Sequence, residues 1–272
     1  MQSALPFEDS TPPLRVVVLG SGSGGNAVVV ESGGRRILLD AGFSCRELER
    51  RMRAVGIDPG TISGLVLTHE HDDHVRGAER FARKHKLPVR ATPGTIAGTA
   101  LSEEVLLRTE PIASERPFEL AGFEIEPFLI PHDAREPVGF VVEDGAGRRL
   151  GLVGDIGCRS QLAWARLVEL DLLLIETNHD LDMLREGPYP WPLKQRVAGR
   201  HGHLSNREAA DGLPELVTER LRQVVLYHLS RTNNKPALAA ATVAEALDRL
   251  GSAAAVVLSE QFAPTAWLEV TT

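Results

Sequence analysis

Residues 68–75 read THEHDDHV, and six of these eight side chains can bind a metal ion or transfer a proton. His69 and His71 are separated by one residue, which points both imidazoles to the same face of an extended chain. Asp73 and His74 are adjacent at the start of a predicted helix, so their side chains diverge and can bind at a second position nearby. In the H-E-x-x-H zinc motif the histidines instead lie one helical turn apart on one helix face. The spacing in this chain therefore predicts two metal ions side by side.

A polar helix N-terminus with solvated charges is the alternative reading, but three histidines within six residues favour a metal site. Two ions need more donors than this stretch holds, and three further candidates each follow an apolar run. One histidine at a strand end usually has a structural role, whereas three such donors together favour ligands. The predicted ligands are His69, His71 and His132 for one ion, Asp73, His74 and His228 for the other, and Asp155 as a bridge. Glu70 and Asp72 are not expected to bind metal.

Apolar periodicity predicts the elements that position these donors. Strands are expected over residues 14–20, 26–32, 35–42, 62–67, 123–132, 137–144, 148–155, 171–176, 223–230 and 254–259. Helices are expected over 44–56, from 73 or 74 to about 86, and over 160–169 and 237–250. Ser44 is the expected N-cap of the first helix, and Gly56 is expected to end it. Strands followed by helices, twice over, predict two packed β-sheets with helices on their outer faces.

Composition is that of an ordinary globular chain, with 43% apolar and 25% charged residues among 272. We expect one domain over residues 14–272 after a flexible leader at 1–13. The leader resembles no signal peptide, and no apolar run reaches the roughly 18–20 residues that cross a bilayer. The two cysteines, Cys45 and Cys158, form no zinc-finger or disulfide pattern, so a cytoplasmic location is expected. The net charge of −7 argues against non-specific coating of nucleic acid.

The glycine-rich stretch at 20–25 matches G-x-G-x-x-G, but the dinucleotide interpretation requires a helix to follow. The next residues, AVVVESGGRRILLD, are β-branched and typical of a hairpin. We therefore expect no nucleotide cofactor. A tight turn that presents backbone N–H groups, with Ser23 and Asn26 at the edge of a substrate site, fits better.

The order H-x-H-x-D-H, then His132, Asp155 and His228, resembles the dinuclear hydrolases of the metallo-β-lactamase fold superfamily. The resemblance runs from Leu14 to about Leu258 and implies an α/β fold, a four-layer αββα sandwich with two mixed β-sheets. In that superfamily an aspartate after an early strand supports the histidine loop. The motif LLDAG gives this role to Asp40, for which capping a turn is the alternative.

Later motifs narrow the resemblance. IETNHD, GHLSN, LYHLSRTNN, SGSGGN and PHDAREPVGF are similar to the YycJ/WalJ-type proteins, which are regarded as DNA exonucleases. The first three also resemble ribonuclease Z, in which a glutamate and a histidine form a proton-relay dyad. The resemblance thereby implies that Glu176 and His203 are catalytic, together with Asp73. The alternatives are a charged strand end for Glu176 and a solvated loop residue for His203, and His179 and Asp180 are equally compatible with site and surface.

The chemistry of phosphodiester hydrolysis fits these residues. It needs an activated water, neutralisation of the phosphoryl charge and a proton for the leaving oxygen. A hydroxide that bridges two divalent ions is the expected nucleophile, and the Glu176–His203 pair is the expected proton donor. Histidine and carboxylate ligands suit two ions of Zn²⁺ or Mn²⁺ per chain.

Residues 187–207 carry four cations and no acid in a chain of negative net charge. This stretch is expected to bind nucleic acid, with Tyr189 and Trp191 stacking on bases. A proline-rich connector with a solvated basic helix is the alternative. The expected phosphate-binding side chains here and after His228 are Lys194, Arg196, Arg200, Ser230, Asn233 and Asn234.

The short interval between Asp155 and Glu176 leaves no room for a β-CASP cap domain. The preferred hypothesis is a dinuclear metal-dependent phosphodiesterase that acts as a DNA exonuclease, with DNA as its partner. The alternatives are a ribonuclease Z-like RNA nuclease and a glyoxalase II-like or lactonase-like ester hydrolase. A regulatory protein with structural metals is the third class, but structural sites are normally closed by protein ligands.

Overall fold

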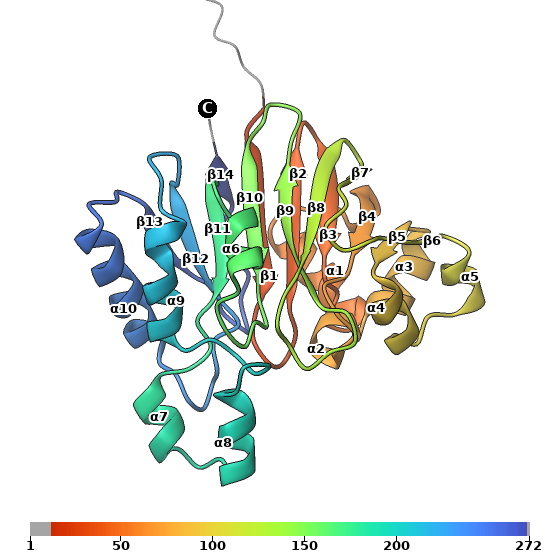
Figure 1. The fold of residues 1–272 in the computed structure, drawn as a ribbon. Helices are drawn as coiled ribbons and strands as arrows, with labels where there is room; N and C mark the ends of the chain where they lie inside the picture. The colour runs from red at the N-terminus through yellow and green to blue at the C-terminus, as the bar shows by residue number, and fades with distance from the viewer. Residues whose placement is uncertain (1–11, 271–272) are drawn as a thin grey trace, which may run out of the picture.

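Two seven-stranded β-sheets form the centre of the computed structural model, which describes residues 12–270 (Figure 1). The first sheet contains, in spatial order, β14 (Leu268–Val270), β1 (Leu14–Gly20), β2 (Ala27–Ser32), β3 (Arg35–Leu39), β4 (Ile62–Val66), β5 (Val89–Ala91) and β6 (Thr109–Pro111). Its pairs are antiparallel from β14 to β3 and parallel from β3 to β6.

The second sheet repeats this mixed arrangement. It contains β13 (Ala255–Leu258), β12 (Gln223–Tyr227), β11 (Leu172–Glu176), β10 (Arg149–Val153), β9 (Val138–Glu143), β8 (Phe123–Leu129) and β7 (Phe118–Leu120). Its pairs are antiparallel from β7 to β10 and parallel from β10 to β13. The parallel strands bring several carboxyl ends to the same edge of the molecule.

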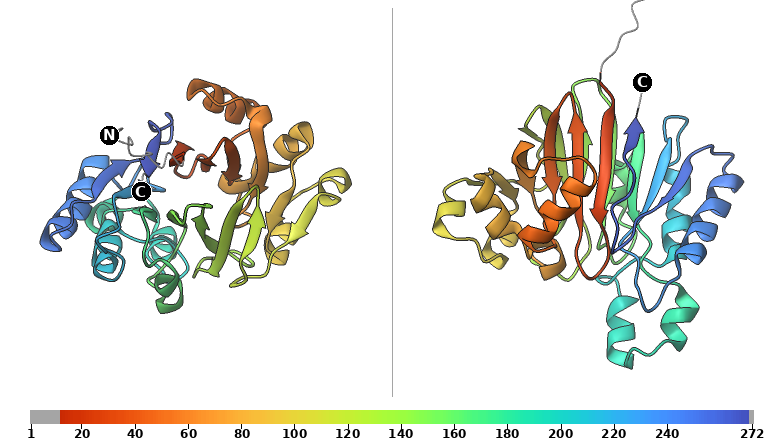
Figure 2. Two further views of the ribbon diagram at one scale, coloured as in Figure 1. Left: turned by 90° about the horizontal axis from the view of Figure 1, so that it is seen from above. Right: turned by 180° about the vertical axis from the view of Figure 1, so that it is seen from behind.

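Helices cover the outer faces of both sheets. The first sheet packs against α1 (Cys45–Ala54) and α3 (Ala78–His85), and the second against α6 (Gln161–Arg166), α9 (Asn206–Gly212) and α10 (Pro236–Arg249). Figure 2 shows these two helical layers on opposite sides of the paired sheets. The shorter helices are α2 (Asp72–Val75), α4 (Pro93–Gly98), α5 (Glu103–Leu106), α7 (Leu181–Glu186), α8 (Trp191–Val197), η1 (Pro59–Thr61) and η2 (Leu213–Glu215).

Alternating side chains on each strand fill different layers of the core. In β1, Val16 and Val18 lie in the cluster between the sheets, whereas Val17 and Leu19 pack with α1 and α3. Successive side chains of a strand point to opposite faces, so a strand buried on both faces is apolar throughout. The predicted four-layer αββα sandwich with two mixed sheets is confirmed.

The elements differ from the prediction in three respects. The sequence did not predict four short strands, namely β5, β6, β7 and β14. The helix predicted from 73 or 74 to about 86 is divided into α2 and α3. The backbone N–H of Gly77, between them, donates to the carbonyl oxygen of Ala41, and the carbonyl oxygen of Asp73 accepts from Asn26, so contacts with preceding loops interrupt the helix. Several strands also end earlier than predicted, before the expected ligands. Asp155 and His228 follow β10 and β12 in a left-handed backbone conformation.

Other predictions have mixed outcomes. Ser44 is the N-cap of α1, where its hydroxyl accepts a hydrogen bond from the backbone N–H of Glu47, as predicted. The leader predicted at 1–13 lies mostly outside the described residues, and the single domain over 14–272 stays a prediction. Within residues 12–270 no helix has the length and apolar character needed to span a membrane.

Candidate metal centre

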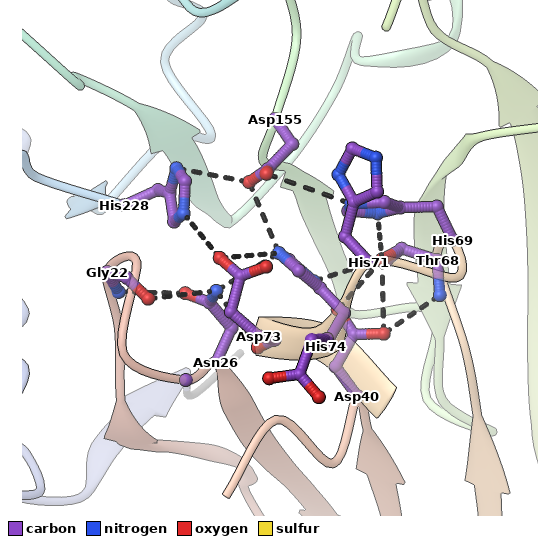
Figure 3. Close-up of polar contacts among 12 residues, drawn as sticks. Gly22, Asn26, Asp40, Thr68, His69, His71, Asp73, His74, Asp155 and His228 are labelled. Atoms are coloured by element: carbon purple, nitrogen blue, oxygen red, sulfur yellow. Dashed lines mark hydrogen bonds and ion pairs between the residues drawn. The ribbon is translucent and has the colours of Figure 1, made fainter. Parts of the chain in front are cut away.

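The predicted ligands converge at the edge of the molecule where strands of both sheets end, and Figure 3 labels six of them, all except His132. The loop from β4 into α2 contributes the histidine-rich motif, and the turns after β8, β10 and β12 contribute the distant donors. Three groups of possible ligand atoms result among the described residues, two of which consist of the predicted ligands, and within each group all the atoms lie within 4.8 Å of one another. One of these two is His69, His71, His132 and Asp155, and the other is Asp73, His74, Asp155 and His228. The structure thus brings all seven predicted ligands together, with Asp155 in both groups.

Two buried atoms in this cluster indicate that a cation fits between the donors. Nε2 of His69 and Oδ1 of Asp155 are buried and lack a hydrogen-bond partner within residues 12–270. Leaving such atoms unpaired is costly, because burial removes their contact with water. Nε2 of His74 lies 3.4 Å from Oδ1 of Asp155, so lone pairs and negative charge face a common centre. The donor set suits divalent cations.

Metal binding needs neutral imidazoles and ionised carboxylates, and the donors of this cluster differ in how far their electrostatics meet that need. Burial alone would lower the pKa values of His74 and His228, but nearby carboxylates, Asp155 first among them, outweigh it: the pKa of His74 is raised well above its usual value and that of His228 to about 10, so a metal ion would displace a proton from each. Burial, reinforced by the nearby His74, lowers the pKa of His69 well below its usual value, so this imidazole is neutral. Burial alone would raise the pKa of Asp155, but the surrounding imidazoles of His228 and His74 outweigh it and hold that pKa well below its usual value. Asp155 is therefore an anion at the centre of the site.

Asp40 and Thr68 orient two of the ligand histidines from behind. Nδ1 of His74 donates to Oδ2 of Asp40 at 2.7 Å, which leaves Nε2 of His74 for a metal ion. The Thr68 hydroxyl donates to Asp40 at 2.9 Å and lies 3.0 Å from Nδ1 of His69, so that nitrogen carries a hydrogen and Nε2 keeps its lone pair. Such contacts fix the tautomer and ring orientation of a ligand histidine. Sequence reasoning missed Thr68, although it directly precedes His69.

We expect Thr68→Val to lower metal affinity by about 10–100-fold, the usual effect of removing a residue that orients a ligand. Valine keeps the shape of the side chain but loses the hydroxyl shared by Asp40 and His69. Thr242→Val, on the exposed face of α10, is the matched control. Competition with a fluorescent chelator measures the affinity, and equal values for the two variants would show that the hydroxyl has no orienting role.

The backbone is strained where the structure turns side chains into the site. Asp40, Asp155 and His228 have φ values of 59°, 50° and 56°, in the left-handed region that non-glycine residues seldom adopt. Each of them lies one or two residues beyond the end of a strand. Such strain persists where the surrounding structure enforces it, and it is common at functional sites. Ser21 provides part of that support, because its hydroxyl accepts a hydrogen bond of 2.7 Å from the backbone N–H of His228.

Glu176 and His203 form a hydrogen-bonded pair beside the metal cluster. Oε1 of the fully buried Glu176 accepts hydrogen bonds from Nδ1 of His203 at 2.8 Å and Nδ1 of His228 at 2.9 Å. Its Oε2 accepts from the backbone N–H groups of Ile156 and Leu204. Although Glu176 and His203 are also close enough to bind metal with Asp155 and His228, these four hydrogen bonds already satisfy the Glu176 carboxylate. We therefore place the ions in the other two groups.

This pairing has a clear electrostatic result. Burial alone would lower the pKa of the His203 imidazole, but the charge and hydrogen bond of Glu176 outweigh it and raise that pKa above its usual value. Reciprocally, burial would raise the pKa of the Glu176 carboxyl, and His203 reverses this effect and lowers it. The pairing thus favours the cationic form of His203 and the anionic form of Glu176.

An open cavity of about 200 Å³ lies over the two groups of predicted ligands. Its lining includes ligand histidines, His203, Ser23 from the glycine loop, and Leu193, Arg196 and Val197 from α8. In Figure 1, α7 and α8 project together beyond the edge at which α2 lies. Nε of Arg196 donates to Oδ2 of Asp133 at 2.7 Å, so a basic residue is held at the cavity wall. Sequence reasoning missed Asp133, which directly follows the ligand His132.

The other predicted basic residues lie outside the cavity lining. Lys194 donates through Nζ to the carbonyl oxygen of Arg185 at 2.6 Å and so ties α8 to the end of α7. Arg200 is exposed, in the loop after α8. Glu70 and Asp72, which were not expected to bind metal, contact the backbone N–H of Arg135 and the side chain of Arg76 respectively.

Three asparagines predicted to contact substrate need a correction, because their side chains are buried. The Asn26 amide contacts the backbone of Gly22 and Asp73, and its Nδ2 lies 3.0 Å from Nε2 of His74. Asn233 is fully buried, and Asn234 donates to the carbonyl oxygens of Thr177 and Asn178. These asparagines shape the loops around the site and are not accessible to a phosphate.

Ser230 is also engaged within the chain. Its hydroxyl accepts hydrogen bonds from the backbone N–H groups of Thr232 at 3.3 Å and Asn233 at 3.1 Å, which stabilises the turn after His228. His179 is fully buried, and neither ring nitrogen has a hydrogen-bond partner within the described residues. Asp180, for which the sequence was compatible with both a site and a surface role, caps α7 with its carboxylate.

The fold and the clustered donors define a metal-dependent hydrolase of the metallo-β-lactamase fold, the class predicted from the sequence. Residues 35–229 match the family model described as the beta-lactamase superfamily domain. The chain is 33% identical to the exodeoxyribonuclease YycJ of Bacillus anthracis, over 88% of this chain and 90% of that protein. It is 32% identical to the exodeoxyribonuclease WalJ of Streptococcus pneumoniae serotype 2 (strain D39), over 85% of this chain and 87% of that protein. The chain therefore belongs to the beta-lactamase superfamily, in the family of the YycJ and WalJ proteins.

More distant similarities agree with this assignment. A ribonuclease Z of Aeropyrum pernix is 29% identical over 71% of this chain and 61% of that protein. The crystal structure of YhfI, a metallo-β-lactamase fold protein from Bacillus subtilis, has a TM-score of 0.71 at 18% identity and covers 95% of this chain and 100% of that one. At that level of identity the structural similarity establishes the fold alone.

Proposed function

We propose that this chain is a dinuclear metal-dependent phosphodiesterase that acts as a DNA exonuclease. The observation that carries this proposal is the Glu176–His203 pair, in which the carboxylate favours the protonated form of an imidazole that lines the same cavity as ligands of the two groups. An ester or lactone hydrolase has less need of such an acid beside a basic helix. The names of the YycJ and WalJ relatives support DNA as the substrate class.

The seven clustered donors would hold two divalent ions, with Zn²⁺ and Mn²⁺ both compatible with nitrogen and oxygen ligands. When bound, such ions lower the pKa of coordinated water and neutralise charge on phosphoryl oxygens. Asp155 contributes a negative charge to both positions, and Asp73 contributes one to the second. Asp40 and Thr68 hold the histidines in the orientation that this binding needs.

His203 is suited to protonate the leaving oxygen of a phosphodiester. Its Nδ1 is engaged by Glu176, so Nε2 is the nitrogen that can donate a proton to a substrate in the cavity. Its side chain is 22% exposed, which gives it access to substrate while Glu176 remains fully buried. Arg196, which lines the same cavity and whose partner is Asp133, is suited to bind a phosphate, and Ser23 borders the same space.

The RNA nuclease is the second candidate, and similarity to a ribonuclease Z favours it. The greater coverage of the YycJ and WalJ relatives favours DNA over RNA. A cytoplasmic location stays a prediction from the cysteine pattern. A polymeric substrate is compatible with an open cavity whose lining includes residues of the projecting α8.

Metal-stripped protein is expected to cleave nothing, and addition of Zn²⁺ or Mn²⁺ is expected to restore release of nucleotides from an end of labelled DNA. The assay places labelled DNA, labelled RNA, a thioester and a lactone side by side. Restored activity on the thioester or lactone alone would refute the phosphodiesterase proposal. A preference for RNA would support the second candidate.

A further inference from the structure

An exposed aromatic ring stands beside the active site on a segment that the predicted site does not include. Phe262 follows β13, and its side chain is 67% exposed. The guanidinium of Arg231 lies over this ring, 4.8 Å from its centroid. Arg231 itself belongs to the turn after β12, three residues beyond the ligand His228. The pair therefore joins the last two loops at the metal-binding edge.

Two other arginine–aromatic pairs in the structure show why this one is unusual. Arg15 lies over Trp267 and Arg51 lies over Phe43, but each of these arginines also forms an ion pair with a glutamate. Arg231 has no ion pair with any residue between 12 and 270. Its charge is therefore uncompensated within the described chain, and its aromatic partner is open to solvent. The other two pairs stabilise the fold, whereas the Arg231 charge and the Phe262 ring are available to contact a ligand.

The backbone next to Phe262 is firmly attached to the glycine loop. Oε1 of the neighbouring Gln261 accepts a hydrogen bond of 2.6 Å from the N–H of Gly24, and its Nε2 donates to the carbonyl oxygen of Gly25 at 3.0 Å. Arg51 also donates to the Gln261 carbonyl oxygen. Ser23, in the middle of that loop, lines the cavity over the metal cluster. Phe262 thus directly follows a residue that is anchored to the loop whose Ser23 lines the cavity.

We propose that Phe262 and Arg231 form a nucleotide-binding platform on which an unpaired base of a nucleic acid strand stacks. This inference rests on the proposed nuclease function and adds the form of the substrate, a strand with unpaired bases next to the bond that is cut. Aromatic rings and arginines bind single strands in this way, because every base has a stacking face and every linkage carries a negative charge. The strand would cross the metal cluster between Arg196 of α8 and this platform.

The test uses single-stranded oligodeoxynucleotides in which one abasic residue is moved along the chain. Their affinity for the metal-loaded protein is measured by fluorescence anisotropy in a His203→Ala background, which slows cleavage during the measurement. In the protein that keeps Phe262, an abasic nucleotide at one position of the oligonucleotide is expected to weaken binding by roughly tenfold, the contribution of one base–aromatic stack. In Phe262→Ala the full oligonucleotide should bind roughly tenfold more weakly, and the position effect should disappear.

Three further variants sharpen the result. Phe262→Trp should restore binding, because a larger ring stacks at least as well. Arg231→Gln should reduce the salt dependence of binding by about the slope of one phosphate contact. Leu107→Ala, which removes a side chain that is 83% exposed after α5, is the control and should leave binding unchanged.

The outcomes separate this proposal from the nuclease proposal. Loss of the position effect in Phe262→Ala supports the platform even if wild-type protein cleaves no DNA, in which case only the nuclease proposal fails. Cleavage of DNA by wild-type protein together with unchanged binding in Phe262→Ala overturns the platform alone. If sedimentation shows that Phe262→Ala changes the oligomeric state while oligonucleotide affinity stays the same, the ring is a contact between copies, and the platform is again overturned.

Discussion

Asp155→Ala is expected to remove both metal ions and to abolish hydrolysis. Asp155 belongs to both groups of ligand atoms, and its carboxylate oxygens lie 3.4 Å from Nε2 of His74 and 3.8 Å from Nε2 of His69. Removing the carboxylate takes away the negative charge that offsets two neighbouring cations. It also leaves the imidazoles without the anion that they surround.

Matched variants separate the effect of the lost Asp155 charge from any effect of the substitution on its strained backbone. Asp155→Asn keeps a side chain that tolerates the left-handed φ of 50°, so any loss of metal in this variant reflects the missing charge. Asp73→Ala removes a donor from one group only and is expected to keep the ion held by His69, His71 and His132. Elemental analysis of dialysed protein gives the ion content, and thermal unfolding shows that each variant is folded. Full metal content in Asp155→Ala would contradict the shared-ligand arrangement.

His203→Ala is expected to leave metal content unchanged and to slow DNA cleavage by about 10²–10⁴-fold, the usual contribution of general acid catalysis. His203 belongs to neither of the two groups that we assign to the ions, so its loss does not remove a ligand. A substrate with a 4-nitrophenolate leaving group needs no proton on departure. The variant should therefore retain most of its activity on methyl 4-nitrophenyl phosphate. Equal losses on both substrates would rule out the acid role.

The pH profile gives an independent check on the same residue. Glu176 raises the pKa of His203, and the acid must be protonated to act. Activity of the wild-type protein on DNA should therefore be sustained at neutral pH and fall as the pH rises through this raised pKa. His203→Ala should lack that alkaline decrease. A profile of the same shape in both proteins would mean that another group sets it.

Much of the site could be predicted from the sequence because its signals are local. The H-x-H-x-D-H spacing stands within one loop, and His132, Asp155 and His228 each follow an apolar run. A strand buried on both faces must be apolar, so its end is visible as the first polar residue after the run. The resemblance to known families then added Asp40, Glu176 and His203, whose roles their own surroundings do not reveal.

The predictions that were wrong concern which polar side chains are accessible to a substrate. Asn26, Asn233 and Asn234 have side chains suited to phosphate, but the structure buries them in hydrogen bonds or against neighbouring loops. Phe262 and Arg231 went unnoticed because a single exposed aromatic and a single arginine have no pattern in sequence. Their contact joins the loops after β12 and β13, and only the packing of those loops brings them together.

The sequence by itself determined the alternation of strands and helices, the αββα class and the candidate metal donors, since these depend on residue type and on periodicity along a few turns or strands. The tertiary structure decided which candidate donors lie together, which polar groups face the cavity and which are hidden. Those properties depend on segments far apart in the chain. The Glu176 carboxylate contacts His203 and His228 only because β11 and β12 are neighbours and the loop after α8 returns to the same edge.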